Sequence, residues 1–134
     1  MTRRQSREQA FILMFEKSFR NDETIQDIIS AAIEAEMLKE DDFSFMLTNK
    51  AEENIDSIDE LIMKFSNGWS ISRIPKVSLA IMRVAVTEML YIESIPVNVS
   101  INEAVELSKI YGGEKDSSFV NGILGSISRD MQNV

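Results

Sequence analysis

Residues 95–124 read IPVNVSINEAVELSKIYGGEKDSSFVNGIL, and this stretch predicts a helix, a turn and the start of a second helix. Pro96 holds the residue before it out of helical geometry, so we expect an extended linker over residues 95–99. Ser100 and Glu103 have the spacing of a capping box, in which each side chain satisfies a backbone N–H at the helix start. The helix that follows would bury apolar side chains at helical spacing: Ile101, Ala104, Val105 and Leu107.

The end of this helix is marked by the glycine pair at 112–113, because glycine commonly follows the last helical residue. Ser117 or Ser118 can cap the next helix, whose apolar positions are Val120, Ile123, Leu124 and Ile127. Gly122 and Gly125 lie inside that helix, where each costs about 1 kcal/mol relative to alanine. We expect these two glycines to allow close packing against a neighbouring backbone.

Helical periodicity extends over most of the remaining chain. Residues 6–19 are dense in apolar side chains and predict a first helix, which can begin nearer Arg3. Thr24 can cap a second helix. From residue 41 to residue 65 the apolar positions recur every three to four residues, which predicts one long helix or two nearly collinear helices.

The middle of the chain completes the helical pattern. Asn67-Gly68 ends the long helical segment, and Trp69 directly after it is interpreted as a lid over the bundle rather than a stacking platform. Residues 77–92 then form a strongly apolar helix. No strand alternation of useful length and no internal repeat occurs. We therefore predict an all-α fold, with residues 1–134 forming a single bundle of about six or seven helices.

The composition limits the chemistry that is available. The 134 residues contain no cysteine and no histidine, which excludes disulfides and removes the commonest general base and most zinc sites. The acidic run at residues 40–42 belongs at a helix start, so we assign no metal and no cofactor. We expect a protein that is not an enzyme. No apolar run of membrane length and no signal-peptide pattern appears, which predicts a cytoplasmic protein.

Charge is distributed unevenly along the chain. The formal net charge is −8, yet residues 1–20 carry +3, residues 21–63 carry −11 and residues 64–134 are neutral overall. We interpret the acidic segment as a solvated surface. The basic N-terminus suggests a local anionic ligand on one side of the molecule.

Three arginines, Arg3, Arg4 and Arg7, cluster at the start of the predicted first helix, where positions 3 and 7, or 4 and 7, share one face. A basic first turn opposes the helix dipole by about 0.3–1 kcal/mol per charge, and like charges one turn apart repel. Contacts from the guanidinium groups to RNA phosphates would compensate for both effects. The alternative is that the arginines are merely solvated.

The turn before the last helix is a second candidate. Its N-terminal N–H groups, with the side chains of Lys115, Ser117 and Ser118, can bind a phosphate. Asn121 can read a base edge, and Phe119 can stack on an unpaired base. The residues alone favour the structural alternative, in which Phe119 packs in the core and the serines are caps.

Two segments resemble the C-terminal half of the NusB family of bacterial transcription antitermination factors: Asn-Glu-Ala-Val-Glu-Leu at 102–107 and Phe-Val-Asn-Gly at 119–122. A weaker resemblance through the arginine-rich start and through Ala-Ile-Met-Arg at 80–83 extends it over nearly the whole chain. The resemblance implies an all-helical protein that binds the single-stranded boxA RNA of ribosomal-RNA leader transcripts. It also implies the ribosomal protein NusE as partner, within the RNA polymerase antitermination complex.

The resemblance implies particular site residues as well. The RNA-binding residues would be Arg3, Arg4, Arg7, Lys115, Ser117, Ser118, Phe119 and Asn121. The NusE face would comprise Phe15, Ser78, Arg83, Glu88 and Tyr91. In the family an acidic residue usually stands where this chain has Ser78, so we expect the NusE contact to persist with altered details. Met82 replaces the usual leucine, a swap of similar volume.

Two other readings stay open. The chain can be a protein-interaction bundle without RNA affinity, such as a homodimer whose interface covers the arginine-rich surface, and salt-sensitive RNA binding would distinguish the two. A NusB-like domain also precedes the catalytic domain of certain RNA methyltransferases. That reading requires a following cofactor-binding domain with a glycine-rich loop, which does not occur within residues 1–134.

Overall fold

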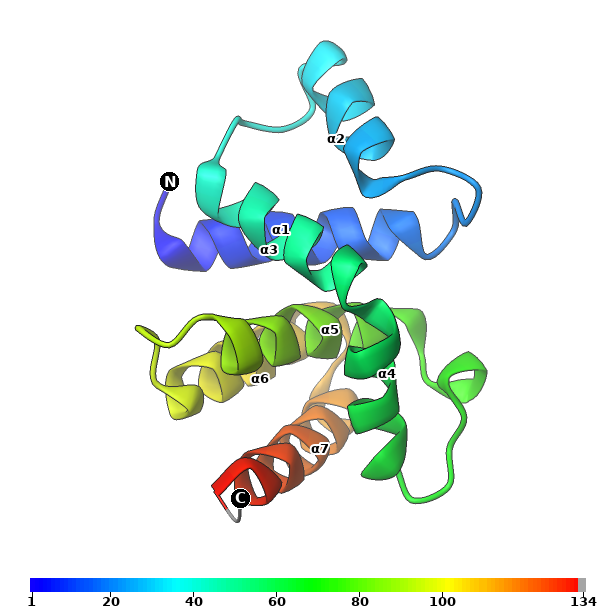
Figure 1. Ribbon diagram of the computed structural model, residues 1–134, viewed down its shortest axis with the longest axis vertical. Helices are drawn as coiled ribbons and strands as arrows, with labels where there is room; N and C mark the ends of the chain where they lie inside the picture. Colours follow the sequence, from blue (N-terminus) through cyan, green and yellow to red (C-terminus); the bar gives the residue numbers. More distant parts are fainter. Residues whose placement is uncertain (133–134) are drawn as a thin grey trace.

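The computed structural model describes residues 1–132, which form seven α-helices and one short 3-10 turn (Figure 1). In chain order these are α1 (Arg3–Lys17), α2 (Ile25–Glu34), α3 (Asp42–Glu53), α4 (Ile55–Lys64), η1 (Ile71–Arg73), α5 (Lys76–Tyr91), α6 (Val97–Tyr111) and α7 (Glu114–Gln132). The described residues contain no strand. The predicted all-α bundle is confirmed.

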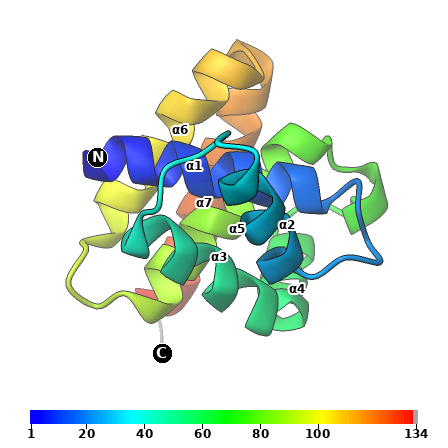
Figure 2. The ribbon, with the colours of Figure 1, turned by 90° about the horizontal axis from the view of Figure 1, so that it is seen from above.

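The helices are arranged around α5. Helices α1, α2 and α3 occupy one half of the molecule and α4 to α7 the other (Figure 1). Helix α5 packs against α1, α3, α4, α6 and α7. Seen from above, α2 lies over α1, and α1 lies over α5 (Figure 2). The central position of α5 follows from its sequence, which is apolar on almost every side.

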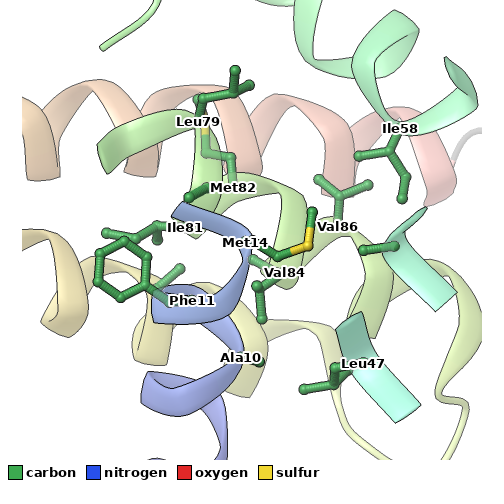
Figure 3. Packing of buried hydrophobic residues seen from close by; sticks show 14 of the residues in the cluster. Ala10, Phe11, Met14, Leu47, Ile58, Leu79, Ile81, Met82, Val84 and Val86 are labelled. Carbon is green, nitrogen blue, oxygen red and sulfur yellow. The ribbon is translucent and has the colours of Figure 1, made fainter. Parts of the chain in front are cut away.

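The core forms where α1 meets α5. Phe11 and Met14 of α1 lie among Ile81 and Val84 of α5, and all four side chains are buried (Figure 3). Burying an apolar side chain of this size stabilises the fold by about 1.5–3 kcal/mol relative to leaving it exposed. The position of α1, and with it the basic N-terminus, is therefore fixed by packing.

Side-chain caps define the starts of the first helices. Thr2 and Gln5 form a capping box that begins α1 at Arg3. Thr24 caps α2 as predicted. The Asp41 carboxylate accepts a hydrogen bond of 2.9 Å from the backbone N–H of Ser44 at the start of α3.

The segment from residue 41 to residue 65 differs from the prediction of collinear helices. Asn54 interrupts it with a non-helical backbone (φ −117°, ψ 22°), and α4 leaves α3 in a new direction (Figure 1). The Asn54 side chain donates a hydrogen bond to the Lys50 carbonyl. The Asn54 backbone N–H donates to the same carbonyl over 3.2 Å, so the side chain adds a second hydrogen bond at the end of α3.

The predicted extended linker over residues 95–99 is wrong. Helix α6 begins at Val97, directly after Pro96, because proline lacks only an N–H that a helix start leaves unpaired anyway. The predicted capping box is wrong as well, since Ser100 lies inside the helix. Ser100 and Glu103 instead form contacts with residues distant in sequence.

Helix α7 begins earlier than predicted. Gly113 takes a left-handed backbone (φ 87°), and α7 starts at Glu114. Ser117 therefore lies inside the first turn rather than capping it. The expectation of close packing against a neighbouring backbone is also wrong. Apart from the backbone of α7 itself, nothing lies within 4 Å of the place a Cβ would take at Gly122, and only the Arg129 side chain does at Gly125.

Candidate nucleic-acid interface

A chain of polar side chains connects the N-terminal arginines to α5 and α6. Arg7 Nε donates to Glu88 Oε2 over 2.8 Å, and Arg7 Nη1 lies 3.4 Å from Glu103 Oε1. Ser100 Oγ donates to Glu88 Oε1 over 2.8 Å. Arg4 contacts Glu103 with two nitrogens, and its Nη2 lies 2.7 Å from Oε2. These five side chains hold the start of α1 against the central helix and α6.

Burial gives Arg4 and Arg7 different roles. The side chains of Arg7 and Glu88 are 8% and 1% exposed, so Arg7 cannot reach an RNA phosphate in this conformation. This corrects the prediction that Arg7 contacts RNA. A buried guanidinium needs its carboxylate partners, because an unpaired buried charge is strongly destabilising. The Arg4 side chain, by contrast, is 68% exposed while it contacts Glu103.

Arg3 and Arg4 present two cations at the start of α1. The Arg3 guanidinium carbon lies 3.9 Å from the centroid of the Phe43 ring, a cation–π geometry. Hydrogen bonding to Glu103 and its negative charge raise the pKa of Arg4 above its usual value. Both arginines are thus oriented by a neighbour and remain open to solvent, which suits contacts with phosphate groups.

The start of α7 brings together the other predicted RNA contacts. Ser117 is buried and its hydroxyl donates to the Glu114 carbonyl over 2.8 Å, which corrects the prediction that it binds RNA. Glu114 and Asp116 occupy the first turn, where they complement the helix dipole and make this end less favourable for a phosphate than predicted. The exposed predicted residues are Lys115, Ser118 and Asn121.

The two groups of predicted RNA contacts lie on α1 and α7, and side chains of α6 connect them. Tyr111 at the end of α6 donates to Glu8 Oε2 of α1 over 3.0 Å. The Tyr111 ring also lies 4.9 Å from the Phe11 ring, between centroids. Helix α6 packs along α7. Helix α6 therefore contacts both of the helices that carry the two groups.

Trp69, predicted to be a lid over the bundle, lies beside Phe119 of α7. The rings of Trp69 and Phe119 are 5.9 Å apart between centroids, at an interplanar angle of 53°. Trp69 is 48% exposed, so the predicted lid is only half covered. Phe119 is partly buried against the core. The sequence signal for this site was an aromatic residue following the turn at Asn67-Gly68.

Two residues predicted to face NusE are buried. Ser78 and Glu88 lie on the inner sides of α5, with 0% and 1% exposure, so neither can contact a partner in this conformation. The Ser78 hydroxyl has no hydrogen-bond partner among the described residues. The prediction that Ser78 and Glu88 contact NusE directly is corrected, because the central position of α5 covers both.

The other three residues of the predicted NusE face point to different neighbours. Arg83 forms a two-nitrogen ion pair with Asp59 of α4, at 2.8 and 2.9 Å. Tyr91 lies beneath the Lys50 ammonium of α3, 5.9 Å from the ring centroid. Phe15 packs near the rings of Phe11 in α1 and of Phe19 just after it. These contacts spread the three side chains over separate parts of α1 and α5.

Clusters of metal ligands and membrane-spanning helices are both absent from residues 1–132. Over this range no three His, Cys, Asp or Glu side chains gather in an arrangement that could hold a metal ion. Nor does any helix there combine the length and apolar character needed to cross a membrane.

Comparison with known sequences identifies relatives over almost the whole length. A sequence profile described as the NusB family matches residues 4–129. The chain is 41% identical over 132 residues to the transcription antitermination protein NusB of Bacillus subtilis strain 168, covering 98% of both chains. It is 39% identical over 137 residues to the protein of the same name from Natranaerobius thermophilus, covering 98% of this chain and 97% of the relative.

Solved structures extend the likeness to the fold. NusB of T. maritima superposes with a TM-score of 0.86 and 32% identity, covering 97% of this chain and 92% of that one. A NusB chain from a crystal structure of the antitermination factors NusB and NusE with double-stranded RNA gives a TM-score of 0.83 and 27% identity, covering 97% and 99%. The similarity therefore includes both halves of the bundle.

Proposed function

The chain belongs to the NusB family, and from this membership we propose that it is a transcription antitermination factor that binds boxA RNA of ribosomal-RNA leader transcripts. The match over residues 4–129 carries the proposal, and the exposed Arg3 and Arg4 at the start of α1 support it. The proposed partner is the ribosomal protein NusE, and the proposed assembly is the RNA polymerase antitermination complex. The role is one of binding in the cytoplasm, without a catalytic step.

The proposed RNA surface uses the exposed members of the two groups. Arg3 and Arg4 contact phosphates from α1, and Lys115 contacts a phosphate from α7. Ser118 and Asn121 donate hydrogen bonds to the sugar-phosphate backbone and to a base edge. Phe119 stacks on an unpaired base. This division fits single-stranded RNA, whose bases are free to stack on aromatic side chains.

The buried residues contribute indirectly. Arg7 holds Glu103 from within the core, and Glu103 orients the guanidinium of Arg4 towards solvent. An RNA phosphate would share or replace the Glu103 contact of Arg4. A preoriented side chain loses less conformational entropy on binding, so the buried pair supports RNA affinity without touching RNA.

The proposal for NusE rests on the resemblance and on the solved complex of relatives. That complex contains NusB, NusE and double-stranded RNA, and its NusB chain shares the fold of this chain. Phe15, Arg83 and Tyr91 remain the proposed contact residues, since each is partly exposed. Ser78 and Glu88 would influence the NusE contact only by setting the packing of α5.

The test is fluorescence anisotropy of a labelled single-stranded boxA-type RNA, with and without NusE, at several salt concentrations. A base-scrambled strand and a duplex of the same sequence are the controls. We expect tighter binding to the boxA strand, further tightening with NusE, and weakening with salt. Three phosphate contacts from Arg3, Arg4 and Lys115 predict a slope of log K against log salt of about −2.

The same experiment separates the proposal from its alternative. Equal affinity for boxA and scrambled RNA, with and without NusE, would rule out the antitermination role. A homodimer that buries the start of α1 would then be the better account. Light scattering coupled to gel filtration would show it as a doubled mass.

A further inference from the structure

Trp69 is the sole tryptophan of the chain and lies in the turn between α4 and η1. Its side chain is 48% exposed. Large aromatic side chains are usually more deeply buried in a monomeric fold, because each can bury about 150–250 Å². A half-exposed indole at a defined place on the surface is available for contact with a ligand.

The turn holds the backbone of Trp69 in place. Asn67 and Gly68 both take left-handed backbone angles (φ 53° and 86°), which reverse the chain. The Trp69 N–H donates to the Ser66 carbonyl over 3.1 Å, and the Ser66 hydroxyl lies 2.7 Å from the Trp69 carbonyl oxygen. Ser66 itself is buried. These hydrogen bonds fix the backbone of Trp69, so the half-exposed indole projects from an ordered turn.

One neighbour of the indole is Phe119, the residue proposed to stack on RNA. Their ring centroids are 5.9 Å apart and the rings are tilted by 53°. One turn further along α7, Gly122 has no atom within 4 Å of its missing side chain, so the helix surface beside Phe119 is open. Lys115, one turn before Phe119, is exposed. An aromatic pair, an open helix surface and a cation therefore adjoin one another.

We propose that Trp69 is a base-stacking residue, which together with Phe119 takes up an unpaired nucleobase of the bound RNA. The proposal rests on the proposed RNA-binding function and extends the site beyond α1 and α7. The chemistry fits a base because each nucleobase has a flat π face that stacks on an exposed indole. Lys115 and Arg73, both exposed, would accompany the stacked nucleotide as phosphate contacts. The indole stands in no enclosed pocket, so it adds affinity for any base and little sequence preference.

The intrinsic fluorescence of Trp69 tests this directly, because no other tryptophan contributes. Unlabelled boxA-type RNA is titrated into the full-length protein while the tryptophan emission is recorded. We expect quenching that saturates over the concentrations at which labelled RNA binds by anisotropy. RNA binding by anisotropy with unchanged Trp69 emission would overturn the proposal while leaving the proposed function intact.

Variants separate stacking from a covering role. Trp69→Leu keeps an apolar side chain over the bundle but removes the aromatic face. We expect it to weaken RNA binding about 5- to 150-fold, with Trp69→Phe retaining most of the affinity. Met37→Ala, at an 81%-exposed residue in the segment between α2 and α3, is the matched control and should bind as the parent protein does.

The outcomes distinguish the possibilities. Thermal melts of each variant show whether the fold is kept. If Trp69→Leu fails to fold, the RNA affinity of Trp69→Phe and the emission titration of the parent protein test whether Trp69 stacks on a base. If Trp69→Leu folds and binds RNA with the affinity of the parent protein, Trp69 only covers the bundle and the stacking proposal is overturned. No RNA binding by the parent protein would overturn the proposed function, and the stacking proposal with it.

Discussion

Arg7 of α1 and Glu88 of α5 form an ion pair of 2.8 Å in which both side chains are almost completely buried. The second oxygen of Glu88 accepts a hydrogen bond from Ser100 of α6. Three helices thus meet at one carboxylate. A buried charge of this kind is tolerated only while its partners satisfy it, so the pair specifies how the three helices fit together.

Removing the carboxylate should strongly destabilise the protein. We expect Glu88→Ala to lower the free energy of unfolding by about 3–5 kcal/mol, because Arg7 would be left buried without its main partner. Urea denaturation followed by circular dichroism measures the change. The double variant Arg7→Met with Glu88→Leu should recover most of the loss. A single variant within about 1 kcal/mol of the parent protein would contradict this account, since Glu103 alone would then suffice for Arg7.

Arg4 should affect RNA binding rather than folding. Its side chain is exposed, so Arg4→Ala should leave the denaturation midpoint unchanged. Losing one phosphate contact should make the salt slope of single-stranded RNA binding shallower by about 0.7. Arg20→Ala is the matched control, because Arg20 lies just beyond the other end of α1 and pairs with Glu16. An unchanged slope in Arg4→Ala would remove Arg4 from the RNA surface.

Asp41 should make the free energy of unfolding depend on pH in the acid range. Burial alone would raise the pKa of Asp41, but hydrogen bonds from Ser44 and Ser6 outweigh it and the pKa lies below its usual value. A lowered folded-state pKa gives stability that is present above the unfolded value of about 3.9 and is lost as the pH falls through the folded value. Asp41→Asn keeps a capping side chain that does not titrate.

The measurement for Asp41 is the free energy of unfolding between pH 7 and pH 2. The free energy of unfolding of the parent protein minus that of Asp41→Asn should be constant from pH 7 to about pH 4. At lower pH this difference should decrease, because the parent protein loses the stability that the Asp41 carboxylate contributes. A difference that stays constant across the whole range would show that the Asp41 carboxylate has the same pKa folded and unfolded.

Replacing Gly122 or Gly113 by alanine should change the free energy of unfolding in opposite directions. Gly122 lies inside α7 with open space around it, so Gly122→Ala should raise the free energy of unfolding by about 0.5–1 kcal/mol. Gly113 has a φ of 87°, which alanine adopts only under strain, so Gly113→Ala should lower the free energy. Thermal melts of the two variants test the pair. Stabilisation by both substitutions would be incompatible with the backbone described for Gly113.

The sequence was sufficient to predict those helix starts and ends that depend only on residues close together in the chain. Thr24 caps α2 because its side chain reaches an N–H three residues away, and the glycine pair ends α6 because of its own backbone freedom. The spacing of Ser100 and Glu103 looked equally local and predicted a capping box. Their actual partners are Glu88, Arg4 and Arg7, which no short-range spacing can reveal.

The site was harder to predict than the fold for the same reason. Whether Arg7 or Arg4 faces solvent depends on how α1 rotates against α5, and that rotation is decided by core packing. Burial of Ser78 and Glu88 likewise follows from α5 being surrounded on all sides. Trp69 and Phe119, 50 residues apart in sequence, become one aromatic surface only when α7 packs beside α4.

The buried pair also sets an order of events during synthesis. Arg7 is separated from Glu88 by 81 residues along the chain. At translation rates of about 5–20 residues per second, the ribosome needs roughly 4–16 s to make that span. Until then α1 has α2 and α3 to pack against, but it lacks the apolar surface of α5 and the Glu88 carboxylate. The contacts of the first helix are therefore complete only after α5 has been made, and those of its basic end only after α6 follows.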